Sequence, residues 1–154
     1  MAYLAAWDVR RAKIFGGCDP TTGIAPFDGL VRQGRSQPPY GRAKRVFWIV
    51  DNGSSHRGQA ACQRLQQQYA NLVLVPLPVH ASWLNQGEIC FSIIQRKGLT
   101  PNDFPSLAAV AERLLQFQSP YEQIAKPFNW KFPHAERREL VAKLQTPSTG
   151  ALAA

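Results

Sequence analysis

The stretch Arg45-Val46-Phe47-Trp48-Ile49-Val50-Asp51-Asn52-Gly53-Ser54-Ser55-His56 decides the fold of this chain. Its first half is the most β-prone apolar run in the sequence, and its second half is an acid, an amide and a small-residue turn. A buried strand that presents a carboxylate at its carboxyl end is a common way to build a metal or catalytic site in an α/β fold. The stretch therefore predicts a strand over residues 46–50 and a candidate site residue at Asp51.

The segments that follow predict a β-α-β unit. Ser54 or Ser55 is placed to cap a helix that runs to about residue 69, and residues 72–75 have the composition of a short strand ended by prolines. A strand, a helix and a second strand in this order favour parallel pairing through a right-handed crossover. The sequence therefore predicts an α/β fold.

The residues before this unit predict a β-hairpin, a helix and a loop. Strands are expected over residues 2–8 and 12–17, with a turn at Arg10 and Arg11, and a short helix is expected over residues 27–33. Residues 34–45 are rich in Gly, Pro and basic side chains, which indicates a loop and a weak case for phosphate contacts. The apolar strand at residue 2 has the character of the middle of a sheet rather than its beginning.

The residues after the unit predict further helices. A helix is expected from Trp83 to about Lys97, stopped by Gly98, and another over about residues 105–118. The second helix repeats apolar residues on one face, at Leu107, Val110, Leu114 and Phe117. Pro120 and Pro127 divide the region beyond, where a last amphipathic helix is expected over residues 134–144. We expect one domain over residues 1–145 and a disordered tail over 146–154.

The composition favours a polyanionic partner and excludes a membrane span. The chain has 154 residues, of which 18 are basic and 10 acidic, a formal net charge of +8. Such a surplus is typical of nucleic-acid binding, although solubility alone also accounts for it. The chain has no apolar run long enough to span a membrane and no signal peptide. Three scattered cysteines without a C-x-x-C pair argue against zinc and disulfides, so a cytoplasmic location is expected.

A second acid, Glu88, follows Asp51 by 37 positions (88 − 51). Phosphodiester cleavage is commonly run by two Mg²⁺ ions, which take hard oxygen ligands from a few rigid carboxylates. Asn85, Ser92 and Gln95 fall on the same face of the expected helix as Glu88, which indicates a face that looks into a polar cleft. The alternative is a structural role, because an acid at the end of a strand often only caps the helix that follows.

Two further polar residues accompany Asp51. Asn52 and His56 are candidates to order water or contact a phosphate near the carboxylate. His56 also fits a solvated turn residue, and His80, among Pro78, Val79 and Ala81, favours a structural role.

Two blocks of sequence carry a family resemblance. The first is Ile49-Val50-Asp51-Asn52 with His56, and the second runs from Leu77-Pro78 through His80-Ala81-Ser82-Trp83-Leu84-Asn85-Gln86 and Glu88 to Phe91-Ser92, followed by Gln95-Arg96-Lys97. Together they closely resemble the DDE-type transposases of bacterial insertion sequences in the mariner superfamily. The resemblance implies a ribonuclease H-like mixed sheet with flanking helices and DNA strand transfer that depends on Mg²⁺ or Mn²⁺. It assigns the second catalytic acid to Asp51 and the third to Glu88, both as metal ligands.

The departures from that family are informative. The family carries its first catalytic acid on an opening strand, whereas this chain resembles the family only from the next strand onward. Loss of that strand is expected to leave a sheet edge or a central gap. Asp8 matches a non-catalytic turn aspartate of the family, and the helix-turn-helix region has no counterpart. Gly87 and Gly98 are expected to loosen the helix that positions Glu88.

Three hypotheses follow from the sequence. The chain is the catalytic part of a transposase, truncated and inactive alone; or a non-enzymatic DNA-binding or interaction fragment that modulates an intact transposase; or an active nuclease completed by Asp8. The partners expected are DNA at the element's ends and target, and a second copy or a full-length transposase, but no membrane. The residues expected to contact phosphates are Arg35, Arg42, Lys44, Arg45, Arg96 and Lys97.

Overall fold

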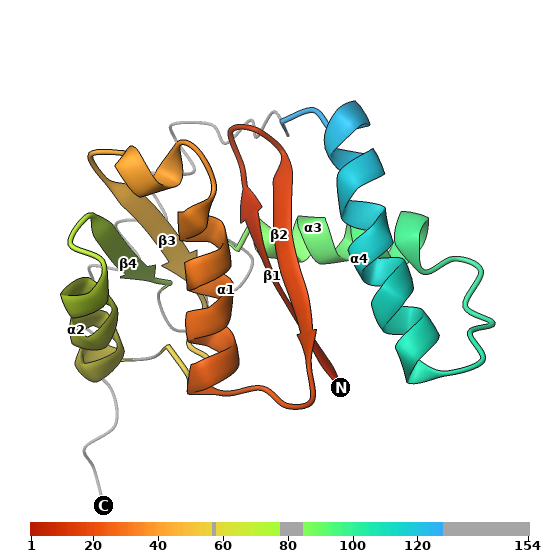
Figure 1. The fold of residues 1–154 in the computed structure, drawn as a ribbon, viewed down its shortest axis with the longest axis horizontal. Helices are drawn as coiled ribbons and strands as arrows, with labels where there is room; N and C mark the ends of the chain where they lie inside the picture. Colours follow the sequence, from red (N-terminus) through yellow and green to blue (C-terminus); the bar gives the residue numbers. More distant parts are fainter. Residues whose placement is uncertain (57, 78–84, 128–154) are drawn as a thin grey trace, which may run out of the picture.

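The computed structural model describes residues 1–56, 58–77 and 85–127, which form two small sheets and four α-helices with short helical turns (Figure 1). The elements are β1 (Ala2–Asp8), β2 (Lys13–Asp19), α1 (Ile24–Ser36), the 3-10 turn η1 (Tyr40–Arg42), β3 (Val46–Val50), α2 (Gly58–Gln68), β4 (Leu72–Pro76), α3 (Gly87–Ile93), the π-helical turn η3 (Ile94–Gly98) and α4 (Leu107–Ile124). No helix in these ranges is long and apolar enough to cross a membrane.

The hairpin and the β-α-β unit are confirmed. Strands β1 and β2 pair antiparallel, from Ala2 opposite Asp19 to Asp8 opposite Lys13. Strands β3 and β4 pair parallel, with Val46 opposite Leu72, and α2 connects them. Parallel neighbours place their carboxyl ends at the same edge of a sheet, so β3 and β4 end together just before Asp51 and Leu77.

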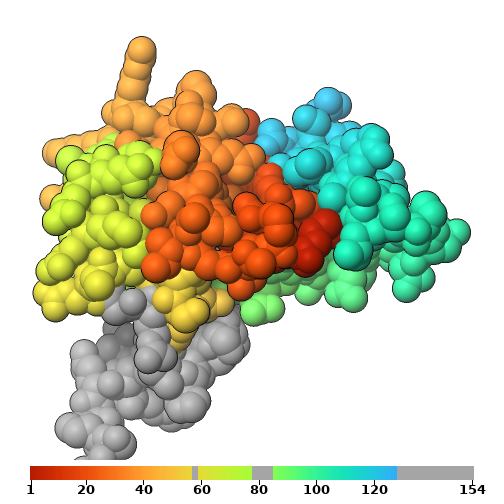
Figure 2. Space-filling view, turned by 60° about the horizontal axis from the view of Figure 1, so that its bottom comes forward, coloured from red at the N-terminus to blue at the C-terminus, as the bar shows by residue number. Residues whose placement is uncertain are grey.

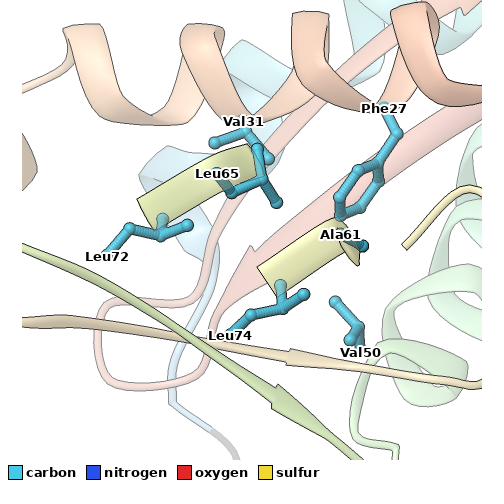
Figure 3. Close-up of a cluster of buried hydrophobic side chains, with 7 residues drawn as sticks. All are labelled: Phe27, Val31, Val50, Ala61, Leu65, Leu72 and Leu74. Atoms are coloured by element: carbon cyan, nitrogen blue, oxygen red, sulfur yellow. The ribbon is translucent and has the colours of Figure 1, made fainter. Parts of the chain in front are cut away.

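Helices α1 and α2 cover one face of the β3–β4 sheet. The cluster between them contains buried side chains from all four elements, as Figure 3 shows: Phe27, Val31, Val50, Ala61, Leu65, Leu72 and Leu74. Strand β3 is less buried than its composition indicates. Phe47 and Ile49 point to the opposite face and are 61% and 56% exposed, whereas Val50 points into the cluster.

The hairpin is covered on both faces because its side chains alternate. Leu4 packs against the cluster of α1 and α2, while Tyr3, Ala5 and Trp7 pack on the opposite side. That second cluster is built from the hairpin, α3, η3 and α4, with Ile14, Cys90, Ile94, Leu114 and Tyr121 buried in it. Figure 2 shows the result: α2 lies at one end of the body (yellow-green), α4 at the other (cyan), and the hairpin and α1 between them (red to orange).

The single mixed sheet expected from the resemblance is not confirmed. Across the described ranges, β1 and β2 form one two-stranded sheet and β3 and β4 form another. In Figure 1, β1 is the hairpin strand that lies toward β3, and α1 lies in front of the space between them.

Several helix boundaries differ from the sequence expectations. Helix α1 extends to Ile24–Ser36, and its last turn and η1 replace part of the loop expected over residues 34–45. Ser54 and Ser55 lie in a turn before α2, which begins at Gly58. Helix α3 begins at Gly87, while residues 78–84 lie outside the described ranges.

Helix α4 runs through Pro120 to Ile124 instead of ending before it. Proline removes one helical hydrogen bond, but the helix continues because Tyr121 is buried and stacks on Phe117 at a ring separation of 5.3 Å. Leu107, which belongs to the apolar face expected for this helix, is 65% exposed at the first turn. The helix expected over residues 134–144 and the tail over 146–154 lie outside the described residues.

Candidate metal centre at the Asp51 loop

Asp51 stands directly after β3 and presents its carboxylate to solvent. The side chain is 56% exposed. Its Oδ1 accepts a hydrogen bond from the backbone N–H of Gly53 at 2.9 Å and lies 2.6 Å from Nε2 of His56. The loop over residues 51–56 is therefore folded around one oxygen of this carboxylate, and we call it the Asp51 loop.

His56 is held on both sides of its ring. Nδ1 lies 3.0 Å from Oγ of Ser55, and the ring packs against Phe27 of α1 with centroids 4.5 Å apart. The side chain is only 14% exposed. His56 is thus an ordered neighbour of Asp51 rather than a solvated turn residue.

These contacts favour the ionised form of Asp51. Partial desolvation raises the pKa of the carboxyl group, but the hydrogen bonds from His56 and Gly53 and the charge of His56 outweigh it, so the pKa lies below its ordinary value. Asp51 is consequently an anion at neutral pH, which is the form that binds a metal ion.

Asn52 is bound by its side chain to the backbone that follows β4. Its Nδ2 donates to the backbone carbonyl of Leu77 at 3.1 Å, and the N–H of Leu77 donates to the carbonyl of Val50 at 2.8 Å. Asn52 therefore extends the pairing of β3 and β4 past their last residues and fixes the start of the Asp51 loop.

Glu88 lies in the first turn of α3 and is exposed. Asn85 precedes the helix, and its Oδ1 accepts from the N–H of Gly87 at 3.1 Å, so its side chain is held in the turn before α3 rather than on the helical face of Glu88. Ser92 and Gln95 are exposed, and Ser92 Oγ donates to the backbone carbonyl of Glu88 at 3.0 Å. The polar face thus meets solvent, and no hydrogen bond within the described residues links the side chain of Glu88 to the Asp51 loop.

The two glycines near Glu88 were expected to loosen the helix from within, but neither lies in the interior of α3. Gly87 is the first residue of the helix, where the cost of an interior glycine does not apply. Gly98 ends η3, and a Cβ there would lie 3.2 Å from the ring of Phe117. Gly98 therefore lets η3 approach α4 closely, and Arg113 secures the contact by donating to the Gly98 carbonyl at 2.9 Å.

Asp8 has a structural role at the opposite end of the fold. Its Oδ1 accepts from the N–H groups of Arg10 at 2.8 Å and Arg11 at 3.2 Å, and its Oδ2 accepts from the hydroxyl of Tyr40. In Figure 1, β1 ends near the top, beside the hairpin turn, whereas β3 runs downward to its end before Asp51. Asp8 therefore closes the hairpin turn and lies apart from the Asp51 loop.

The basic residues fall into three groups. Arg35 is half-buried, donates to the Tyr40 carbonyl and lies over the ring of Tyr69 at 5.5 Å, unlike the exposed cations of the other two groups. Exposed cations precede β3, at Arg42, Lys44 and Arg45. Because a strand rises by about 3.3 Å per residue, Arg45 and Asp51 are about 20 Å apart along the chain. Arg96 and Lys97 are exposed on η3.

Three residues around the loop were missed in the sequence: Phe27, Asp28 and Arg64. Arg64 of α2 donates to both carboxylate oxygens of Asp28 on α1, and also to the backbone carbonyl of Ser55. Asp28 and Arg64 are 36 positions apart and belong to separate helices. No local pattern marks such a pair.

The donor chemistry at Asp51 and Glu88 fits a hard divalent cation. Both are exposed carboxylates, and Oδ2 of Asp51 has no hydrogen-bond partner in the part of the chain that the structure describes. The same ranges bring no three His, Cys, Asp or Glu side chains together as a metal-binding group. The described residues thus supply two separate candidate ligands and no completed cluster.

Comparison with known proteins identifies the family. No curated protein and no solved structure gives a significant match to the chain. Residues 2–110, which include both the Asp51 loop and α3, match the DDE superfamily endonuclease family. This match spans more than two thirds of the sequence, and the chain belongs to the DDE superfamily endonucleases.

Proposed function

We propose that the chain is the catalytic part of a transposase that cleaves and transfers DNA strands in transposition, within the mariner branch found in bacterial insertion sequences. The observation that carries this proposal is an exposed, ionised Asp51 at the carboxyl end of a parallel strand pair, in a chain of the DDE superfamily. The fold proposed with it is ribonuclease H-like.

Asp51 and Glu88 are the proposed ligands of Mg²⁺ or Mn²⁺. Such an ion, when bound, activates the attacking water or 3′ hydroxyl and stabilises the leaving oxygen. The chain's own part is to present oxygens: Gly53 and His56 hold Oδ1 of Asp51 and leave Oδ2 for the ion. Exposed cations at Arg42, Lys44, Arg45, Arg96 and Lys97 are the proposed contacts to DNA phosphates.

We further propose that the chain alone does not cleave DNA. Asp8 is occupied by two donors of the hairpin turn and by the hydroxyl of Tyr40, and the described strands form two separate sheets rather than one. A third acid and a strand that joins the two sheets are therefore proposed to come from outside the described residues, either from this protein or from a full-length transposase.

The occupied Asp8 and the two separate sheets also favour a second candidate function, that of a non-enzymatic DNA-binding or interaction protein. A chain without a completed metal group can still bind DNA or pair with an intact transposase and interfere with it. The exposed basic residues support this role without any chemistry at Asp51.

An assay on supercoiled plasmid and on linear duplex DNA in Mn²⁺ tests these alternatives. The leading proposal expects duplex binding that weakens as salt is raised and no cleavage beyond that of the Asp51→Asn variant. Cleavage abolished by Asp51→Asn and by Glu88→Gln would show that the chain is active alone, and its loss in Asp8→Asn would overturn the structural role of Asp8. Absence of any DNA binding would count against both proposals.

A further inference from the structure

We propose that Asp28 and Arg64 form a positioning pair that sets the shape of the Asp51 loop and thereby the direction of the Asp51 carboxylate. The inference rests on the proposed function of Asp51 as a metal ligand, and it concerns residues that do not themselves touch the reacting groups.

Arg64 makes a bidentate contact with the carboxylate of Asp28. Nε of Arg64 donates to Oδ2 of Asp28 at 3.2 Å and Nη2 to Oδ1 at 3.1 Å, while Nη2 also donates to the Ser55 carbonyl at 3.1 Å. A planar guanidinium makes this double contact to a carboxylate, whereas the point charge of a lysine cannot reproduce it. One side chain thus joins α1, α2 and the Asp51 loop.

The pair is firmly anchored from both helices. Its neighbours Phe27 on α1 and Ala61 and Leu65 on α2 are buried in one cluster. The side chains of Arg64 and Asp28 are 32% and 19% exposed, so solvent reaches them only in part. Because Asp28 neutralises Arg64, this arginine is a poor phosphate contact and its position serves the loop.

Helix α1 therefore restrains the loop through two adjacent residues. Phe27 packs on the ring of His56, which in turn contacts Oδ1 of Asp51, and Asp28 holds Arg64 against Ser55. Among the described residues, Arg64 is the side chain outside the loop that hydrogen-bonds to it. Without that bond, the segment from Gly53 to His56 loses its link to α2.

Amide hydrogen exchange followed by NMR tests the loop restraint. The amide of Gly53 donates to Oδ1 of Asp51, and the amide of His56 donates to the Gly53 carbonyl. In Arg64→Lys and in Asp28→Asn we expect both amides to exchange about tenfold faster. The exchange rates of amides in α2 and β3 are expected to be unchanged. Asp28→Glu keeps a carboxylate for Arg64 and is expected to retain most of the protection of the loop amides. Unchanged loop exchange, or an equal rise throughout the domain, would overturn the proposal.

Arg113→Lys is the matched control, because Arg113 also donates to a backbone carbonyl, that of Gly98, in the other half of the molecule. It is expected to leave the Asp51 loop unaffected. A Mn²⁺ titration then separates this inference from the proposed function. Weaker Mn²⁺ binding in Arg64→Lys supports positioning, and equal binding with a loosened loop contradicts it. If the unmodified chain shows no Asp51-dependent Mn²⁺ binding, the proposed function fails while the exchange data still decide whether the pair holds the loop.

Discussion

At the scale of single residues, two aspartates at strand ends have taken opposite roles. Asp8 closes β1 and has both oxygens satisfied by the hairpin turn and by Tyr40. Asp51 follows β3, is 56% exposed, and has no hydrogen-bond partner for Oδ2 among the described residues. Burial and the neighbouring Asp8 raise the pKa of Tyr40 to about 12, so its hydroxyl remains a donor to Asp8 at any ordinary pH. The partners of each carboxylate, rather than its place at a strand end, separate the structural acid from the candidate ligand.

The lowered pKa of Asp51 gives a prediction for acid titration. A carboxyl group with a depressed folded pKa contributes stability that is present above its unfolded value, near 3.8, and is lost as pH falls through the lower folded value. The carboxyl ¹³C shift of Asp51 should therefore titrate with a midpoint below 3.8. In His56→Ala the midpoint should rise, because partial desolvation is then opposed only by Gly53. A midpoint at or above the ordinary value in the unmodified chain would contradict the contact with His56.

At the scale of elements, close packing decides where glycine is required. Gly98 in η3 faces the ring of Phe117, and a Cβ at this position would lie 3.2 Å from Cγ of that ring. Gly29 in α1 has nothing within 4 Å of the same position. Gly29 lies in the interior of α1 and Gly98 at the end of η3, and of these two only Gly98 lies at a contact with another helix.

Alanine substitutions at these two glycines should have opposite effects on stability. Gly29→Ala should raise the free energy of unfolding by about 0.5–1 kcal/mol, because alanine favours the helix and restricts the unfolded chain. Gly98→Ala should lower it by about 1 kcal/mol, because the strain of displacing Phe117 exceeds the helical gain. Urea unfolding curves measure both, and equal stabilisation by the two substitutions would show that η3 and α4 do not pack as described.

At the scale of the whole molecule, the described residues form two small sheets with a helical layer on each side of the hairpin. Helix α1 packs on the hairpin and on the cluster beneath α2, so it holds the two sheets together. The hairpin has both faces covered, whereas the β3–β4 sheet keeps Phe47 and Ile49 exposed on one face. This arrangement supports the proposal that the domain is completed by a further strand.

The elements built on strong local patterns were predictable from the sequence. Hydrophobic runs gave all four strands and their pairing, because hairpins and β-α-β units follow from the order of elements. The continuation of α4 through Pro120 was not predictable from the sequence, because it depends on the burial of Tyr121 by distant residues.

The site was predictable only in part, for the same reason. Asp51 and its neighbour His56 are local in sequence, and the structure brings them together. The inward turn of Arg35 and the pairing of Arg64 with Asp28 depend on contacts between separate elements, which no single segment records. The assignment of Asp51 and Glu88 as metal ligands stays a prediction.

The most direct test of that central claim is a Mn²⁺ titration of the full chain, followed by paramagnetic broadening of its amide signals. The claim predicts saturable binding that broadens Gly53 and the first turn of α3, and that is weakened at least tenfold in Asp51→Asn and in Glu88→Gln but not in Asp8→Asn. A loss of this size corresponds to about 1.4 kcal/mol or more, as expected when one of few carboxylate ligands is removed. Binding that both variants retain at full strength, or broadening centred away from these two segments, would contradict it.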